Sequence, residues 1–419
     1  RYLLDLTGRI DGSSNFASKQ RSAPFWSAGV RWNIYNEKFM QTHGWFENLA
    51  IRANIGTVGN QNFQLSQIMT LYNFLKMYDG VMGAEIMSVA NPELKWQTTL
   101  NRNIGLEFSL LQGLVNLDFN YYSNITKNNL TDIAILPSTG FSTYKANMGK
   151  VRNRGYEFSL SITPFKENGW IVNVFVNGAH NKNKLLSISD ALRDYNKEIK
   201  ENQTAHMNTA GYTQLERIFL FEEGQSLNSI FAVRSKGIDP GTGQEIYVTA
   251  DGAQTFQWNA ADQIVVGNTE PILKGYFGLN VDYRRWSFGA NFQYSFGADR
   301  YNKTLYEKME GGNFAQNADR RALTQRWTKP GDIAKYRGYG NTSQLKPTSR
   351  FVQKDNFLSM TSARLSYTLN ANDLKNFGIS LLKFTISTND LFYVSTIKQE
   401  RGLSYPFART FYLSLQANF

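Results

Sequence analysis

Apolar and polar residues alternate along most of this chain with the period of two that β-strands show. In the closing segment FYLSLQANF, odd-numbered residues are apolar and even-numbered residues are polar. The same alternation recurs at residues 2–10, 26–34, 49–55, 104–110, 115–121, 156–162, 170–176, 277–283, 286–296, 363–369 and 382–386. We therefore expect about twelve strands, each near the ~10 residues that cross a bilayer as a tilted barrel strand.

A soluble β-sandwich alternates in the same way and is the main alternative. Aromatic residues stand at the ends of many apolar faces, as they do in the girdles of membrane barrels. They are Trp26, Trp32, Tyr121, Trp170, Tyr283 and Trp286. The charges that fall inside the expected strands all lie on the polar face. Both features favour a membrane barrel.

The connections between the expected strands alternate strictly in length. Short turns are expected around Gly113 and at 165–169, 284–285 and 370–377. Long segments separate them, at 57–95, 125–151, 184–273, 297–356 and 395–409. Outer-membrane barrels have short periplasmic turns and long extracellular loops, whereas a sandwich has no reason to keep this parity. The sequence therefore predicts an all-β, antiparallel transmembrane β-barrel with long extracellular loops.

The long loops carry some structure of their own. Residues 189–202 predict a short helix with Ser189 as its cap, and 318–327 predict another. Residues 237–251 predict a turn followed by a strand. We interpret both helices as loop scaffolding. Asp239 and Glu245 lack the spacing of a calcium-binding loop, so we do not expect calcium there.

Composition and motifs argue against most kinds of catalytic site, metal site and nucleic-acid interface. The 419 residues include no cysteine, and His43, His180 and His206 lie far apart without ligand spacing. Metalloprotease, P-loop and serine-hydrolase motifs are absent. The basic residues behind the net charge of +11 are scattered singly, which is not typical of nucleic-acid binding. We expect no catalytic residues, no metal site, no cofactor and no nucleic-acid partner.

The first residues, RYLLDLTGRIDG, already alternate as a strand. We expect the twelve strands to form one side of a larger barrel, with edges at 2–10 and 411–419. Unpaired backbone groups at such edges are not tolerated in lipid. We therefore expect strands outside this sequence to pair with both edges.

Several longer stretches resemble one family. They are DGSSNF (11–16), TVGNQNF (57–63), NPELKWQTT (91–99), LPSTGFSTYKANMGKVRNRGYEFSL (136–160), GQSLNSIFAVRSKGIDPGTGQEIY (224–247), RFVQKDNFLSMTSARLSYTL (350–369) and KQERGLSYPFARTFYLSLQANF (398–419). Together they resemble the C-terminal barrel part of SusC/RagA-type TonB-dependent outer-membrane transporters, over the whole length of the chain.

The resemblance implies a large single-chain barrel closed by an N-terminal plug, in the outer membrane of a Gram-negative bacterium. It implies a SusD-like surface lipoprotein as a hinged lid, and import of oligosaccharides or peptides powered by the TonB complex. The plug, the TonB-contacting segment and a signal peptide are not found in this sequence. The resemblance also implies that Phe419 is a signal for the membrane-assembly machinery.

Two sets of residues are candidates for contact with a transported ligand. The polar strand faces would line the interior with Asp5, Arg9, Arg31, Arg52, Glu107, Asp118, Glu157 and Arg364. Loop aromatics that would stack on sugar rings or peptide side chains are Tyr72, Phe74, Tyr78, Trp258 and Phe314. The alternative for these aromatics is packing of loop against loop or against the lipoprotein.

Two alternatives to nutrient import remain at this stage. One is a receptor for siderophores or other metal complexes, against which the family motifs argue. The other is a surface adhesin barrel that does not transport, against which the charged interior argues.

Overall fold

Twelve antiparallel strands form one sheet in the order β1-β2-β3-β6-β7-β10-β11-β16-β17-β18-β19-β21, with the short β20 beside β18. The computed structural model describes residues 1–13, 21–40, 45–60, 70–88, 91, 95–134, 143–147, 149–201, 221–312, 319–339, 345–371, 373–374, 378–398 and 409–419. The strands are β1 (Tyr2–Gly12), β2 (Ser22–Asn33), β3 (Phe46–Asn60), β6 (Gln97–Leu110), β7 (Val115–Lys127), β10 (Gly149–Glu167), β11 (Trp170–Ile188), β16 (Leu273–Tyr283), β17 (Trp286–Tyr301), β18 (Val352–Asn370), β19 (Leu381–Asn389), β20 (Tyr393–Ser395) and β21 (Phe411–Asn418). Each of the twelve predicted strands is present, so the predicted all-β antiparallel fold is confirmed.

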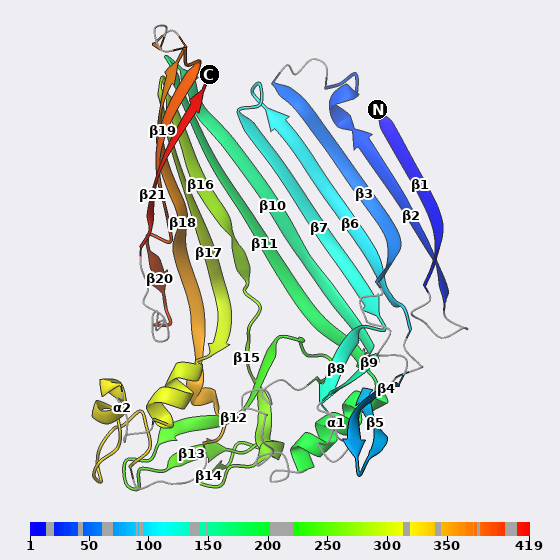
Figure 1. Cartoon of the computed structure of the whole chain (residues 1–419), viewed down its shortest axis with the longest axis vertical. Coiled ribbons are helices and arrows are strands. Elements are labelled where there is room, and N and C mark those ends of the chain that lie inside the picture. Colours follow the sequence, from blue (N-terminus) through cyan, green and yellow to red (C-terminus); the bar gives the residue numbers. More distant parts are fainter. Residues whose placement is uncertain are drawn as a thin grey trace.

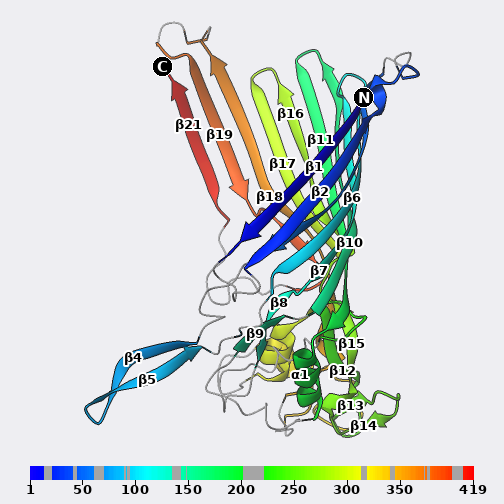
Figure 2. The same cartoon turned by 90° about the vertical axis from the view of Figure 1, so that its right-hand side faces the viewer.

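The sheet is a curved wall with turns at one end and the long loops at the other (Figures 1 and 2). The turn between β10 and β11 has two residues, Asn168 and Gly169, with φ of 54° and 79°. Positive φ at both positions is the hairpin geometry that Asn-Gly favours, because it matches the twist of the flanking strands. The predicted parity of short and long connections is confirmed from β3 to the end of the sheet; the connection between β2 and β3, residues 34–45 at the turn end, is longer than that between β1 and β2, residues 13–21.

The register keeps apolar and polar positions on opposite faces. Leu117 of β7 is paired with Leu160 of β10, which is paired with Val176 of β11. Rings stack across strands on this apolar face: the centroids of Trp170 and Tyr283 lie 4.1 Å apart near the turn end. The aromatic girdle predicted from the sequence is therefore present at that end.

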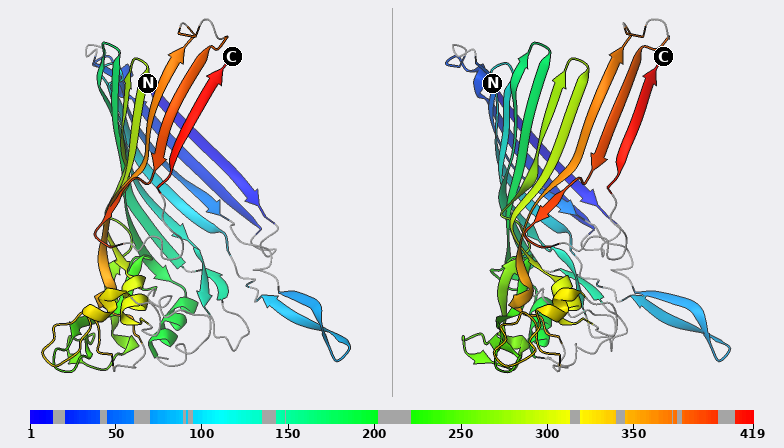
Figure 3. Two further views of the ribbon diagram at one scale, coloured as in Figure 1. Left: turned by 60° about the vertical axis from the view of Figure 1, so that its left-hand side comes forward. Right: turned by 90° about the vertical axis from the view of Figure 1, so that its left-hand side faces the viewer.

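The first and last strands of the sheet each have one neighbour. In the described part of the chain, β1 pairs with β2, β21 pairs with β19, and no ladder joins β1 to β21 (Figure 3). Side chains on both are largely exposed, with Leu4 at 69% and Leu413 at 88% of their full accessible area. The described residues thus form an open sheet with edges where the sequence predicts them.

The long connections contain smaller elements. They are β4 (Leu71–Tyr78), β5 (Val81–Ser88), β8 (Leu130–Ala134), β9 (Thr143–Asn147), β12 (Ser229–Ile238), β13 (Glu245–Val248), β14 (Gln254–Thr255), β15 (Gln263–Asn268), α1 (Asp190–Glu201), α2 (Arg320–Thr324), and the helical turns η2 (Ile34–Asn36), η6 (Ala260–Asp262), η7 (Leu305–Glu310) and η8 (Ser349–Phe351). Strands β14-β13-β12-β15 form a second sheet. We call this sheet together with η6, η7, α2 and η8 the loop cluster.

The loop elements expected from the sequence are largely confirmed. Helix α1 lies within 189–202, α2 within 318–327, and β13 follows a turn within 237–251. The predicted cap at Ser189 is wrong: its hydroxyl is buried without a hydrogen-bond partner, although its carbonyl accepts from two backbone N–H groups of α1. Asp319 does cap α2, because its Oδ1 accepts from the backbone N–H of Arg321 at 2.8 Å.

An apolar core joins the two longest connections. Ile230 of β12 is fully buried and packs with Tyr301, Tyr306 and Phe351. Ile230 belongs to the connection 184–273, and the three aromatic residues belong to 297–356. The backbone N–H of Ser235 also donates to the Ser349 hydroxyl at 3.0 Å. The described parts of the two connections therefore fold as one unit.

The strands extend further into the long connections than the alternation predicts. As a result, the prediction that every strand charge lies on the polar face is wrong. Arg102 lies beyond Ile104 on β6 and shares the apolar face with Ile55, its partner on β3. Arg154 and Lys182, paired with each other on β10 and β11, lie on the same face. Alternation weakens past the bilayer, so the residue pattern did not reveal these extensions.

No helix in the described ranges is both long and apolar enough to cross a membrane.

Candidate functional site on the polar wall and in the loop cluster

Four of the predicted interior residues form a charged cluster on the polar face. The Arg31 guanidinium donates to both carboxylate oxygens of Glu107, at 3.1 and 2.7 Å. Arg52 also contacts Glu107, and its Nη2 lies 2.9 Å from Oδ2 of Asp118. The same nitrogen donates to Oδ1 of Asn120 at 2.7 Å. We call these five residues the wall cluster.

Strand register explains why these residues meet. Arg31, Arg52, Gly105 and Asn120 are directly opposite one another on β2, β3, β6 and β7. Gly105 is the reason that Arg52 reaches β7, because a Cβ at Gly105 would lie 2.5 Å from Nε of Arg52. A larger residue at that position would push the guanidinium off its three partners.

The other predicted interior residues lie on the same face but outside the wall cluster. Asp5 accepts from the Thr7 hydroxyl, and Arg9 pairs with Asp11 at 3.2 Å. Arg364 lies over Gly289, whose ideal Cβ position is 3.2 Å from its Nε. These residues line distant parts of the wall, so the structure gathers only half of the predicted set.

Glu157 lines a groove on the polar wall beside the wall cluster. The groove has a volume of about 460 Å³ and is also lined by Asp118, Asn177, Lys274, Tyr276 and Gln293. Ala179 lies between Glu157 and Lys274 in the register, and its short side chain leaves the hollow. Carboxylate, amide, amine and phenol groups facing one groove can hydrogen-bond either sugar hydroxyls or peptide backbone.

A second ionic network is buried in the loop cluster. The Glu310 carboxylate is 1% exposed and lies 2.6 Å from Nε of Arg337 and 2.8 Å from Nη1 of Arg350. Arg350 also pairs with Glu245, from the other long connection, at 2.9 Å. Arg326 donates to the carbonyls of residues 309, 310, 322 and 337. We call Glu245, Glu310, Arg337 and Arg350 the loop network.

Electrostatics keep the loop network ionised. Burial alone would raise the pKa of Glu310, but the charges of Arg350 and Arg337 outweigh burial and lower that pKa. A lowered pKa stabilises the fold above the ordinary carboxyl range, and the stabilisation is lost as the pH falls through the lowered value. At the α2 cap, hydrogen bonds from Arg321 lower the pKa of Asp319 to about 2.

A cavity of about 520 Å³ lies next to the loop network. Arg350, Tyr336 and Phe351 form part of its wall, with Lys335 at the exposed side. Its other polar lining side chains include Asn302, Gln325 and Gln353. The cavity combines aromatic rings with amide and cationic groups, which suits a polar organic ligand.

The predicted loop aromatics do not come together. Tyr72 and Phe74 lie on the β4–β5 hairpin, which projects away from the wall (Figure 2), with ring centroids 6.5 Å apart. Both are about half exposed. The Tyr78 backbone pairs with Val81 on the same hairpin. Trp258 lies in the loop cluster, where its Nε1 donates to the Pro347 carbonyl at 3.3 Å. Phe314 lies outside the described residues.

Sequence reasoning missed the loop network. Glu245 and Arg350 are separated by more than a hundred residues, and each stands in a polar loop without periodicity. No pattern signals which loop charges will be buried together. Among the described residues no group of three potential metal ligands is present.

The profile of the family described as "TonB dependent receptor-like, beta-barrel" matches residues 1–213. "TonB-dependent receptor P39" of Formosa agariphila is 27% identical over 94% of this chain and 41% of its own length. "TonB-dependent receptor SusC" of Bacteroides thetaiotaomicron is 26% identical over 76% of this chain and 32% of its own length. The chain thus spans about two fifths or less of the curated relatives it matches.

Solved structures agree in fold. The "RagAB peptide transporter" aligns with a TM-score of 0.79 at 24% identity, over 94% of this chain and 42% of that chain. The "RagAB peptide importer in the 'closed-closed' state" aligns with a TM-score of 0.78 at 25% identity, with the same coverage. The predicted resemblance to SusC/RagA-type proteins is confirmed. The chain belongs to the TonB-dependent receptor-like β-barrel family, and the wall is part of a Gram-negative outer-membrane barrel.

Proposed function

We propose that the whole protein of which this chain is part actively imports a nutrient across the outer membrane, energised by the TonB complex. The observation that carries the proposal is the division of the wall, along the segments that alternate, into an apolar outer face and a charged inner face. Interior charge suits a water-filled or plugged lumen. The wall cluster and the groove beside it present hydrogen-bonding groups to whatever occupies that lumen.

The substrate class we propose is an oligosaccharide or a peptide. Two similar structures are of a peptide transporter, and one relative is a SusC protein. The loop cavity and the wall groove offer amides, carboxylates, cations and tyrosine rings rather than a metal-ligand set. Tyr72 and Phe74, exposed on their hairpin, are the loop aromatics best placed to stack on a sugar ring or an apolar side chain. A siderophore receptor and a non-transporting adhesin remain the alternatives.

The proposal is tested by deleting the full-length gene in its native bacterium. Growth and uptake are then compared on mixed oligosaccharides, on mixed peptides and on siderophore-bound iron. We expect loss of uptake of one nutrient class, restored by the wild-type gene but not by a gene with its TonB-contacting segment removed. Loss restricted to siderophore-bound iron, or unchanged uptake of every class, would refute the proposal.

We further propose that a SusD-like lipoprotein docks on the loop cluster. The connections 184–273 and 297–356 fold as one unit held by Ile230 and the loop network, so they offer a preformed surface. A stable complex of this kind is expected to bury more than ~1,000 Å². The TonB complex would act on the opposite, turn-bearing side, and the N-terminal plug would lie inside the barrel.

Loop trimming tests this docking site. Replacing 221–268 and 305–350 of the full-length protein by short linkers should abolish co-purification of the lipoprotein. Removing the β4–β5 hairpin, residues 71–88, is the matched control and should weaken co-purification less. A heat-modifiable gel shift verifies that each barrel is folded. Unchanged co-purification after trimming of a folded barrel would show that the docking assignment is wrong.

A further inference from the structure

A row of unpaired cations lies on the outward face of the wall. Arg102, Arg154 and Lys182 project from β6, β10 and β11, on the apolar side of the register. Each is exposed, and none forms an ion pair or hydrogen bond with any described residue. The outward positions of these strands and of β7 carry one carboxylate over their described lengths, Glu167, which is paired with Trp170 at the turn end, far from the cations. Interior arginines of the neighbouring strands β2 and β3 differ from these cations, since Arg31 and Arg52 are both paired.

The height of this row matches the far surface of the bilayer. Trp170, stacked on Tyr283, marks the turn-side interface. Lys182 follows Trp170 by twelve residues on the same strand. At a rise of ~3.3 Å per residue this is about 40 Å along the strand. A strand tilt of ~40° reduces it to roughly 30 Å along the membrane normal, just beyond an apolar band of ~25 Å. The cations therefore lie at the level of the extracellular lipid headgroups.

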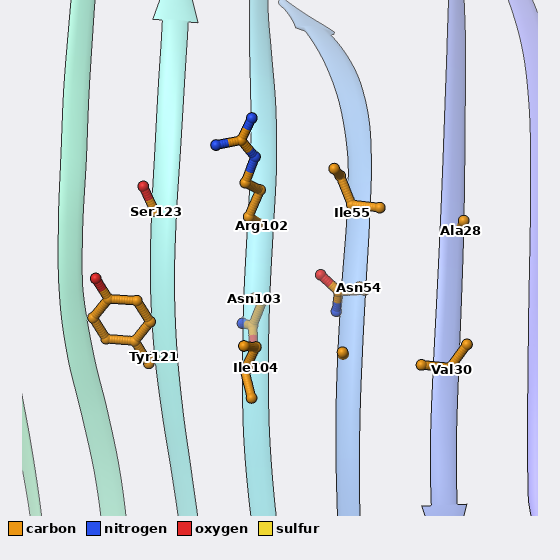
Figure 4. Close-up of a pocket in the computed structure, with 10 residues that line it drawn as sticks. Ala28, Val30, Asn54, Ile55, Arg102, Asn103, Ile104, Tyr121 and Ser123 are labelled. Atoms are coloured by element: carbon orange, nitrogen blue, oxygen red, sulfur yellow. The ribbon is translucent and has the colours of Figure 1, made fainter.

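An apolar hollow lies directly below Arg102 on the membrane side (Figure 4). Its volume is about 460 Å³. The outward side chains that line it are Ala28, Val30, Ala53, Ile55, Ile104 and Tyr121, with Ser123 beside Arg102. The small side chains of Ala28 and Ala53 between larger neighbours create the hollow. A shallow apolar depression facing lipid is a place for a hydrocarbon chain.

We propose that this face binds a phosphate-bearing lipid of the outer leaflet. One acyl chain fills the hollow, and the headgroup phosphate meets the guanidinium of Arg102. Arg154 and Lys182 extend the cationic row over ~15 Å at the usual strand spacing, enough for a second anionic group. Guanidinium groups bind phosphate in a bidentate manner, so the two arginines supply geometry as well as charge. This lipid site is separate from the import route on the inner face.

The cation row is tested with the purified full-length protein in neutral detergent, titrated with phosphorylated lipid A and followed by native mass spectrometry. Each basic group near a lipid surface contributes on the order of a factor of five. The variant R102Q/R154Q/K182Q should therefore bind lipid A about a hundredfold more weakly. The variant K38Q/K166Q/R284Q removes three cations from the turn end and is the matched control. It should bind as the wild type does.

Two further measurements distinguish a lipid-binding site from a site that binds any anion. Ala53→Phe fills the hollow but keeps every cation, and should weaken lipid A binding while the heat-modifiable gel shift stays normal. Inorganic phosphate at the same phosphate concentration should not displace lipid A. Equal losses in the two triple variants, full binding by Ala53→Phe, or displacement by inorganic phosphate would each overturn the proposal.

Discussion

The charged side chains of the wall cluster and of the loop network differ in their exposure to solvent. In the wall, charges are sorted by face, and the wall cluster stays in contact with the interior, with the Asp118 carboxylate 40% exposed. In the loop network of the loop cluster the ions are buried, and Glu310 is shared between Arg337 and Arg350. The ions of the wall cluster are paired but remain partly exposed to solvent, whereas those of the loop network are paired in a buried site.

This difference separates structural charges from charges available to a ligand. A buried ion must be paired within the chain, because the desolvation penalty is several kcal/mol per ion. The loop network is satisfied internally and fixes one loop against the other. The wall cluster retains exposed carboxylate oxygens, so its groups can still exchange partners with a plug or a substrate. Exposure, more than the presence of charge, identifies the candidate ligand contacts.

The largest expected effect is on the loop network. Glu310→Ala would leave Arg337 and Arg350 buried without one of their counter-ions, and breaking a buried pair typically costs 3–5 kcal/mol. We expect the loop cluster of the full-length protein to become sensitive to trypsin while the barrel stays folded. Glu223→Ala, which removes an exposed partner of Arg193, is the control and should leave the digestion pattern unchanged. Resistance of the Glu310 variant would show that the network does not hold the loops.

A smaller effect is expected when the sorting of charge in the wall is reversed. Leu117→Arg or Phe292→Arg places a cation in the lipid-facing band, at a cost of roughly 2–4 kcal/mol near the bilayer midplane. The neighbouring changes Asn116→Arg and Asn291→Arg place it on the inner face and should be milder. Urea unfolding in vesicles, followed by the heat-modifiable gel shift, measures both. Equal losses would contradict the assignment of the two faces.

The smallest effect is expected in the wall cluster. Asp118→Asn removes one partly exposed ion pair with Arg52, and such pairs contribute 0.2–1 kcal/mol. We expect the barrel stability to change by less than about 1 kcal/mol while uptake falls, if the cluster contacts plug or substrate. Ser287→Asn, another inner-face change remote from the cluster, is the control for uptake. A large loss of stability would place Asp118 among the structural charges.

Much of the fold was predictable because lipid imposes a simple rule. A strand between lipid and a polar interior must alternate, and this rule located all twelve strands of the wall and the faces of Leu117 and Asn116. Where the strands leave the bilayer the rule ends, and the positions of Arg102, Arg154 and Lys182 were not foreseen. Their side chains continue the outward face although they are no longer apolar.

The site was predictable in composition but not in geometry. Alternation placed Arg31, Arg52, Glu107 and Asp118 on one face, but their meeting depends on register and on the space above Gly105. The predicted loop aromatics do not form one binding surface, because Tyr72 and Trp258 belong to separate loop structures. Loop packing is decided by long-range contacts such as Ile230 against Phe351, which no local pattern reports.

Strands β10 and β11 have nineteen residues each, and their length sets how far the loops stand from the membrane. Such a strand is about 60 Å long, or roughly 45 Å along the membrane normal at a tilt of ~40°. The hydrocarbon core accounts for ~30 Å of that height. The strands therefore continue as a stiff, hydrogen-bonded sheet beyond the bilayer and hold the loop cluster above the lipid headgroups. Capture of a large solute would begin above the cell surface, within reach of molecules too bulky to approach the membrane itself.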